Sequence, residues 1–171
     1  MLSTMAGLVQ LGVLLLLLAA AYVPFGNYLA AVYTDGRHWR VERAIYRVVR
    51  VDPDSEQRWT GYAAALLAFS FLSVVLLYLL QRLQGLLPLS LDRGPVDSGI
   101  AFNTAISFVT NTNWQAYSGE TGVTAVTQAL GLTVQNFVSA ATGLAVVVAL
   151  IRGLVRVGTD RLGNFWVDLT R

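Results

Sequence analysis

Residues 107–121, with the sequence SFVTNTNWQAYSGET, contain the groups in this chain best suited to binding an ion. At their centre, Thr110, Asn111, Thr112 and Asn113 alternate hydroxyl and amide side chains. Successive carbonyl groups of an extended strand can face one axis only if alternate residues adopt unusual backbone angles. Glycine does so at least cost, and asparagine is the next most tolerant residue. We therefore expect main-chain oxygens of residues 110–113 to replace part of the hydration shell of a monovalent cation.

Four residues that follow this strand are candidates for supporting it. We expect Trp114, Gln115 and Tyr117 to brace the loop or line its mouth, and Glu120 to draw cations toward the vestibule. A Thr/Asn pattern alone is a weak signal, because helix caps and turns favour the same residues. The order of segments around it, a span, a half-helix, a polar strand and a second span, gives the pattern its weight.

The composition is that of a membrane protein. Of the 171 residues, 55% are hydrophobic and 13% are charged, against about 45–50% and 25% in soluble domains. The absence of cysteine and the single histidine exclude disulfides and zinc clusters. The basic residues are all arginines in loops, which indicates membrane topology rather than nucleic-acid binding. With no phosphorylatable-aspartate motif and no Gly-rich phosphate loop, we expect the chain to bind no nucleotide and to be no enzyme by itself.

Three stretches are long enough to cross a bilayer, which takes about 20 apolar residues. Residues 5–23 and 62–80 are almost uniformly apolar. Residues 125–151 also contain Gln128, Gln135 and Asn136 among small residues, which suits a helix that lines a cavity, although ordinary helix packing explains it as well. Residues 5–23 could also be a signal peptide, but no arginine precedes Arg37.

The placement of arginines predicts the orientation, because cytoplasmic loops carry an excess of basic residues. Six arginines lie in residues 34–59 and four follow Ile151, whereas the connection between the second and third spans has two. We therefore expect the N-terminus outside, and residues 34–59 and 153–171 in the cytoplasm.

Arg40, Arg43, Arg47 and Arg50 are spaced by three or four residues. This spacing predicts a short helix with its guanidinium groups on one side. Its apolar surface would come from Trp39, Val41, Ile45, Val48 and Val49. Such a helix either lies in the headgroup plane or docks another subunit. His38 beside it is expected to be an incidental surface residue.

A half-helix is predicted between the second and third spans. Pro95 starts it, Asp97 or Ser98 caps it, and about eleven mostly apolar residues follow. At about 1.5 Å per residue this helix would cross half of the hydrocarbon core. Entering from outside as a re-entrant helix, it would direct its partly negative C-terminus at the bilayer interior, where a cation would be stabilised.

Several stretches resemble one family of transport proteins. They are FNTAISFVTNTNWQAYSGE, GLTVQNFVSAATGLAVVVALIRG and LGNFWVDLTR, with weaker agreement in GVLLLLLAAAYVPFG and VERAIYRVVRVDP. The chain is similar to the pore-forming, potassium-binding A subunits of the Kdp potassium-transporting ATPases, which are relatives of the Trk/Ktr/HKT transporters. The resemblance implies an all-α membrane protein with one extra N-terminal helix and four helix–pore loop–helix repeats around one selectivity filter.

The resemblance also implies a division of this chain. Residues 1–33 would be the N-terminal transmembrane helix and 34–59 a cytoplasmic Arg-rich amphipathic segment. Residues 60–152 would be the first repeat, with the pore half-helix at about 98–109 and the filter strand at 110–115. Residues 153–171 would be a connector to a second repeat. Only one of four pore loops is present, so we expect the chain to be an N-terminal fragment.

The implied function is that of the potassium-binding and translocating subunit of an ATP-driven uptake complex in the bacterial inner membrane. The first-repeat filter would comprise Thr110, Asn111, Thr112 and Asn113, binding the transported K+ through backbone oxygens, with Gln115 beside it. Implied partners are a P-type ATPase subunit that supplies the energy, a small single-span subunit and a peripheral subunit. Two alternatives remain open: a passive cation channel made of four copies, and a non-conducting assembly subunit.

Overall fold

The computed structural model of the chain describes residues 2–90 and 92–171. The chain forms two compact units, Met1–Trp39 with Arg171, and Arg40–Thr170. The second unit contains the candidate site.

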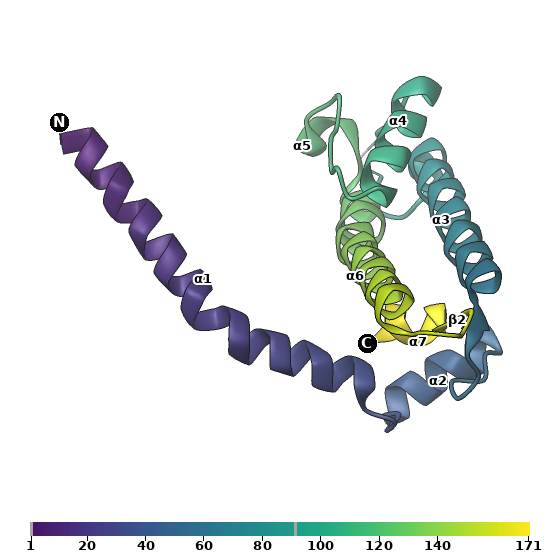
Figure 1. Ribbon diagram of the computed structural model, residues 1–171. Helices are drawn as coiled ribbons and strands as arrows, with labels where there is room; N and C mark the ends of the chain where they lie inside the picture. Colours follow the sequence, from purple (N-terminus) through teal and green to yellow (C-terminus); the bar gives the residue numbers. More distant parts are fainter. Residues whose placement is uncertain (1, 91) are drawn as a thin grey trace. The chain divides into compact units, whose positions relative to one another are not determined.

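The first unit is built on the helix α1, Leu2–Thr34. This helix extends beyond the expected span of residues 5–23, because it continues through Pro24. Proline removes one backbone hydrogen bond and clashes with the carbonyl four residues earlier, so it bends a helix without always ending it. Figure 1 shows a bend near the middle of α1. The helix ends at Thr34, whose hydroxyl donates to the carbonyl of Ala30 at 2.7 Å, just before Asp35 and Gly36.

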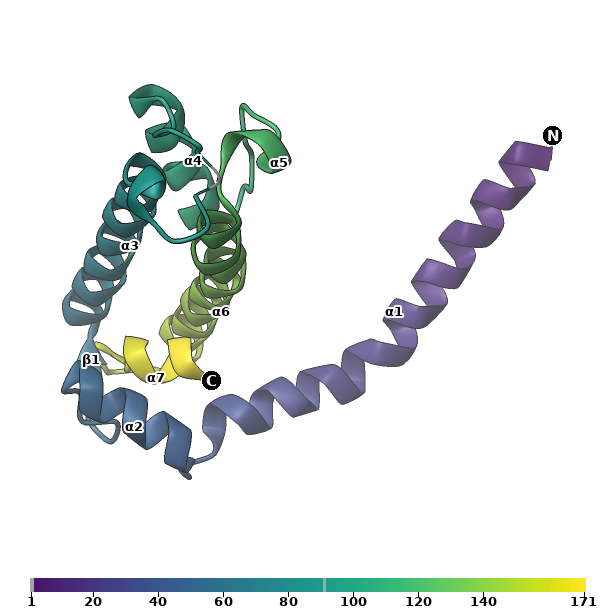
Figure 2. The same cartoon turned by 180° about the vertical axis from the view of Figure 1, so that it is seen from behind.

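Two long helices frame the second unit. The helices α3 (Trp59–Arg82) and α6 (Val134–Val155) run side by side in opposite directions (Figures 1 and 2). A π-helix, η2 (Thr127–Thr133), leads directly into α6. Three helical segments are long and apolar enough to cross a membrane: Met5–Thr34, Trp59–Arg82 and Thr127–Val155. The first two predicted spans therefore lie inside longer helices, and the π-turn in the third was not predicted.

The elements at one end of α3 and α6 carry the candidate site. A 3₁₀ turn, η1 (Gln84–Leu86), follows α3, and an irregular segment leads to α4 (Ser98–Val109). The Asp97 carboxylate caps α4 by accepting from the backbone N–H groups of Gly99 and Ile100 at 2.9 and 3.3 Å. A loop and the short α5 (Gly119–Gly122) complete this end (Figure 1).

A small apolar core fixes α4 against α3 and η2. Its buried members are Leu77, Val96, Ala101, Ala105, Phe108, Val123 and Leu132. The alanines of α4 have no bulk beyond Cβ, so α4 lies close to α3. Gly131 serves the same purpose in η2, because a Cβ there would lie 2.5 Å from a methyl group of Leu80. The position of α4 is therefore set by packing against two helices of the frame.

The opposite end of the frame contains α2 (Arg40–Val49), α7 (Phe165–Thr170) and two short strands (Figure 2). The strands β1 (Gln57–Arg58) and β2 (Arg161–Gly163) pair antiparallel. A second core of Tyr62, Ala145, Ala149 and Phe165 lies here. Residues 153–171, expected only as a connector, thus include β2 and α7.

The helix α2 corresponds to the predicted Arg-rich helix with two corrections, one at each end. It ends at Val49, and Arg50 follows with a φ of 55°, so Arg50 does not belong to the helical row of arginines. A residue with positive φ cannot continue a right-handed helix. Trp39 likewise precedes the helix. Tyr46 is buried, and Val41 and Val48 are exposed.

Candidate functional site

The predicted filter begins as the C-terminal cap of α4. The N–H of Asn111 donates to the carbonyl of Phe108 at 3.3 Å, and the N–H of Thr112 donates to that of Ser107 at 2.8 Å. These two bonds, with φ of 60° at Asn111, form a Schellman motif, in which asparagine takes the usual place of glycine. Thr110 and Asn111 therefore form a turn, which differs from the extended strand expected from residue 110 onward.

Ser107 holds the rest of this loop against the end of α4. Its carbonyl also accepts from the N–H of Asn113 at 3.2 Å, and its hydroxyl oxygen accepts from the N–H of Trp114 at 2.6 Å. The carbonyls of Ile106, Ser107 and Phe108 in the last turn of α4 are thus occupied by amides of residues 110–113. Asn113 has a φ of 58°, so both asparagines adopt the left-handed conformation that the sequence predicts.

The main-chain oxygens of residues 110–113 have no partner within the part of the chain that the structure describes. Their amide groups are used in the turn, but these four carbonyls accept no hydrogen bond from residues 2–90 or 92–171. All four residues are exposed. Carbonyl oxygens without a protein partner are available to bind water or a cation.

The helix α6 braces the loop through one side chain. The hydroxyl of Ser139 donates to the Oδ1 atom of Asn111 at 3.1 Å, and the Nδ2 group of Asn113 donates to the same oxygen at 3.2 Å. The hydroxyls of Thr110 and Thr112 lie 3.1 Å apart and are hydrogen-bonded. The Asn111 side chain therefore joins both left-handed residues to the frame.

Two buried glutamines at the end of α3 also contact this region. The Nε2 group of Gln81 donates to the carbonyls of Leu77 and Ala101, both at 3.1 Å, and its Oε1 atom accepts from the Tyr117 hydroxyl at 3.1 Å. The predicted bracing role of Tyr117 thus has a physical basis in this bond. Gln81 and Tyr117 join α3, α4 and the loop after the filter.

Gln84 makes a similar set of bonds one turn further along. Its Nε2 group donates to the carbonyls of Gly94 and Gly122 at 2.8 and 3.2 Å. Its Oε1 atom accepts from the N–H of Thr124 at 3.1 Å. The exposed fractions of the Gln81 and Gln84 side chains are 0% and 1%, so both are enclosed by the elements that they join.

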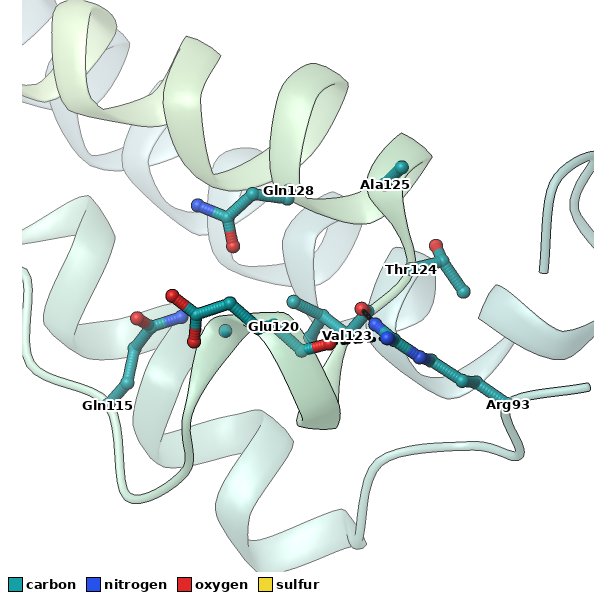
Figure 3. A pocket seen from close by; sticks show the side chains of 8 residues that line it. Arg93, Gln115, Glu120, Val123, Thr124, Ala125 and Gln128 are labelled. Carbon is teal, nitrogen blue, oxygen red and sulfur yellow. Dashed lines mark hydrogen bonds between the residues drawn. The ribbon is translucent and has the colours of Figure 1, made fainter. Parts of the chain in front are cut away.

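A pocket of about 470 Å³ lies beside the loop, between α5 and the start of η2. Figure 3 shows the Glu120 carboxylate and the amides of Gln115 and Gln128 on one side of it, with Arg93 entering from the other. The Arg93 guanidinium donates to the carbonyls of Val123 and Glu120 and so joins the segment before α4 to α5. The buried Nε2 atom of Gln115 has no hydrogen-bond partner among the described residues.

Glu120 carries the negative charge of this pocket. A hydrogen bond from the Ser118 hydroxyl, and then the backbone N–H of Glu120 itself, hold the pKa of its carboxyl below the usual 4.5. The side chain is exposed, so it is ionised at neutral pH and accessible to dissolved cations. Among the described residues, no group of three or more His, Cys, Asp or Glu side chains could hold a metal ion.

The structure thus places the eight predicted site residues in one region with different roles. Residues 110–113 form the capped turn, and Gln115 and Glu120 line the pocket. The indole of Trp114 is 53% exposed, and the hydrogen bond of this residue to the loop comes from its backbone. Four further residues of this region were not predicted from the sequence: Ser107, Gln81, Gln84 and Arg93. For the two glutamines a signal existed, since they are the polar residues at the end of an apolar helix.

Comparison with known proteins places the chain among transport subunits. The family described as "Potassium-transporting ATPase A subunit" matches residues 12–171. The potassium-transporting ATPase potassium-binding subunits of Mycobacteroides abscessus and Kineococcus radiotolerans are 57% and 59% identical to it, over 99% and 97% of this chain and 32% and 30% of theirs. That of Rhodococcus opacus is 60% identical over 97% of this chain and 30% of its own length. The chain therefore spans about a third of the length of these relatives.

Proposed function

The chain belongs to the family of potassium-transporting ATPase A subunits, and from this premise we propose that residues 110–113 supply one side of a potassium-selectivity filter. The free main-chain oxygens of these residues carry the proposal. Two of these residues, Asn111 and Asn113, are left-handed, and they turn the backbone so that the carbonyls leave the hydrogen-bonded pattern of α4. Carbonyl oxygens that replace water ligands are the means by which potassium channels select their ion.

One loop supplies oxygens on one side of an ion only. The relatives are about three times as long as this chain, and further loops in a protein of that length would complete the ring. In this proposal the chain itself performs no catalysis. A partner ATPase subunit supplies the energy, and the ion reaches the filter from the extracytoplasmic side.

The pocket beside the loop is the proposed entrance. Glu120 is ionised and exposed, so it raises the local concentration of cations. Gln115 lies between this carboxylate and the filter residues in sequence, and one end of its amide is buried without a partner. Rotation of that amide by 180° would place Oε1 at the same position, where it would act as a cation ligand.

The test is a potassium titration of the full-length protein in its ATPase complex. We expect Gln115→Leu to raise the KM for K+ by about tenfold, equal to about 1.4 kcal/mol, with kcat little changed. Thr159→Ala, an exposed residue at the other end of the second unit, is the control and should leave KM unchanged. If the KM for K+ is the same in Gln115→Leu and in the wild type, Gln115 does not bind the ion at the proposed entrance.

A bilayer experiment separates this function from the passive channel. The 171-residue chain alone is reconstituted in vesicles, and Rb+ flux is measured without ATP. The proposal expects no flux above that of empty vesicles, since four identical loops are not assembled. Selective flux from the chain alone would favour the homotetrameric channel instead.

A further inference from the structure

The segment from Gly94 to Thr124, called here the pore segment, is held at both ends by Gln84 in the turn η1, just after α3. It contains α4, the filter loop and α5. Gln84 donates to Gly94 at its first residue and to Gly122 near its end, and accepts from the N–H of Thr124. A single side chain thus joins both ends of the pore segment.

Gln81 joins the interior of the same segment. It lies in the last turn of α3, three residues before Gln84. It donates to Ala101 in the first turn of α4 and accepts from Tyr117 beyond the filter. The filter loop, residues 110–115, therefore lies between two attachment points, Ala101 and Tyr117, that share one amide.

The hydrogen bonds of Gln81 and Gln84 help to set the backbone geometry of the filter loop. The loop from Thr110 to Asn113 is exposed on its free side, so its carbonyl directions depend on what holds its two ends. Ser139 binds the side chain of Asn111 near the start of the loop, and the Ser107 hydroxyl accepts from the N–H of Trp114 near its end. The segment after the loop, which leads to η2, is held by the two glutamines. Gln81 accepts from the Tyr117 hydroxyl, and Gln84 accepts from the N–H of Thr124.

The amides of Gln81 and Gln84 are buried, so water cannot replace a hydrogen-bond partner that either of them loses. In each of the two side chains, the Nε2 group donates two hydrogen bonds and the Oε1 atom accepts one, and all six distances are 3.2 Å or less. Fully satisfied buried polar networks rigidify their surroundings, whereas a network with one missing partner leaves unpaired buried groups. Loss of one hydrogen bond in this network would therefore shift the filter loop, because water cannot take the place of the missing partner.

We propose that Gln81 and Gln84 are positioning residues that set the ion selectivity of the filter through Tyr117 and Thr124. They touch no ion themselves. This inference rests on the proposed function, because it assumes that residues 110–113 bind K+. Loosening the network would let the carbonyls adapt to ions of other sizes, so discrimination would fall before turnover does.

The mildest test removes one oxygen atom. Tyr117→Phe deletes the hydroxyl that donates to Gln81 and leaves the ring, which packs against the first core. The matched control is Tyr78→Phe on α3, because Tyr78 packs against the same core and no hydrogen bond of its hydroxyl to the described residues is seen. Both variants are made in the full-length protein within its ATPase complex, and ATPase activity is measured against K+, Rb+ and Na+.

We expect Tyr117→Phe to raise the KM for K+ by about threefold and to raise the Rb+ to K+ activity ratio by a similar factor, with kcat unchanged. Tyr78→Phe should match the wild type. In a Gln81→Leu background, Tyr117→Phe should add nothing, because both changes remove the same bond. A purely structural role would lower the amount of folded complex and leave the ion ratio unchanged.

A third variant separates the failure of this inference from the failure of the proposed function. Asn113→Val, which disturbs the filter loop directly, is measured in the same preparations. If Asn113→Val alters the KM for K+ while Tyr117→Phe and Gln81→Leu leave the ion ratio unchanged, the positioning role is overturned and the filter stands. If Asn113→Val also has no effect on KM, the filter assignment itself is overturned.

Discussion

The hydroxyl of Ser139 on α6 donates a hydrogen bond of 3.1 Å to the side-chain oxygen of Asn111 in the filter loop. This bond links a buried serine of the frame to a left-handed residue. Removing one hydrogen bond of this kind costs about 0.5–1.5 kcal/mol. We therefore expect Ser139→Ala to raise the KM for K+ of the full-length complex by about threefold.

Thr142 provides the control for that measurement. It lies less than one turn further along α6, and its hydroxyl bonds only within its own helix, to the carbonyl of Val138 at 2.8 Å. Thr142→Ala should therefore leave the KM for K+ unchanged. Equal changes in both variants would show that the helix, and not the contact with Asn111, determines the effect.

Asn113 allows the left-handed backbone to be tested directly. Its φ is 58°, a conformation that costs other residues about 1–2 kcal/mol and glycine almost nothing. We expect Asn113→Gly to keep the free energy of unfolding within about 1 kcal/mol of the wild type and to preserve potassium affinity. Asn113→Val should lower the free energy of unfolding by more than this and weaken potassium binding. Thermal unfolding of the chain and potassium titration of the complex measure the two effects, and a tolerated valine would contradict the assigned backbone.

Hydrophobic pattern was enough to predict much of this fold. The all-α membrane class is confirmed by the three long apolar helices and the family match. The helix α4 covers Ser98–Val109 with Asp97 as its cap, one of the two predicted caps, so it starts three residues after the predicted start at Pro95. The end of α1 was less predictable, since a proline inside an apolar stretch either ends or bends a helix. The π-turn at Thr127–Thr133 contains Gly131, which lies close to Leu80, and such a tertiary contact cannot be read from one sequence.

The positive φ angles of the candidate site were predictable, whereas the capping turn at Thr110 and Asn111 and the supports of the loop were not. Asparagine tolerates positive φ, so Asn111 and Asn113 could be assigned from residue type alone. The bonds of Gln81 and Gln84 join residues up to 40 positions apart in sequence, and a single sequence carries no signal for such pairs. The same holds for Arg93, whose carbonyl partners lie in α5 and just after it.

The end of the second unit that contains α7 has an ion pair, and replacing one of its members tests stability without touching the candidate site. Arg152 and Asp168 form a bidentate pair at 2.6 and 2.9 Å, and the Asp168 side chain is 2% exposed. Removing one partner of a buried pair leaves an uncompensated charge and costs about 3–5 kcal/mol. We expect Arg152→Met to lower the free energy of unfolding by this amount, measured by denaturant unfolding in micelles.

An exposed pair at the same end is the matched control. Arg156 and Glu56 lie 2.8 Å apart, with side chains 36% and 43% exposed. Exposed pairs contribute about 0–1 kcal/mol, so Arg156→Met should have little effect on unfolding. If both substitutions cost the same, burial would not be the reason for the stability of the Arg152 pair.

Gly163 gives a second way to disturb the buried pair without changing its charges. The residue has a φ of 99°, and a Cβ there would overlap the Arg152 guanidinium. Gly163→Ala should therefore destabilise the chain through both backbone strain and displacement of Arg152. We expect a lower unfolding midpoint than in Gly153→Ala, where an added Cβ meets only Leu162 at 3.5 Å. Similar midpoints in the two variants would contradict this contact.

Glu120 predicts how ion uptake depends on pH and salt. Its carboxyl pKa is lowered below 4.5 by the Ser118 hydroxyl, so its charge is present above that value and is lost only as the pH falls through the lowered pKa. Cation attraction by Glu120 should therefore be constant between about pH 5.5 and 8. We expect Glu120→Gln to raise the KM for K+ by about twofold at about 0.01 M salt, and the difference to vanish near 1 M, where the Debye length is about 3 Å. Potassium titrations of the full-length complex at both salt concentrations measure it, and an effect that persists at high salt would mean that Glu120 binds the ion directly.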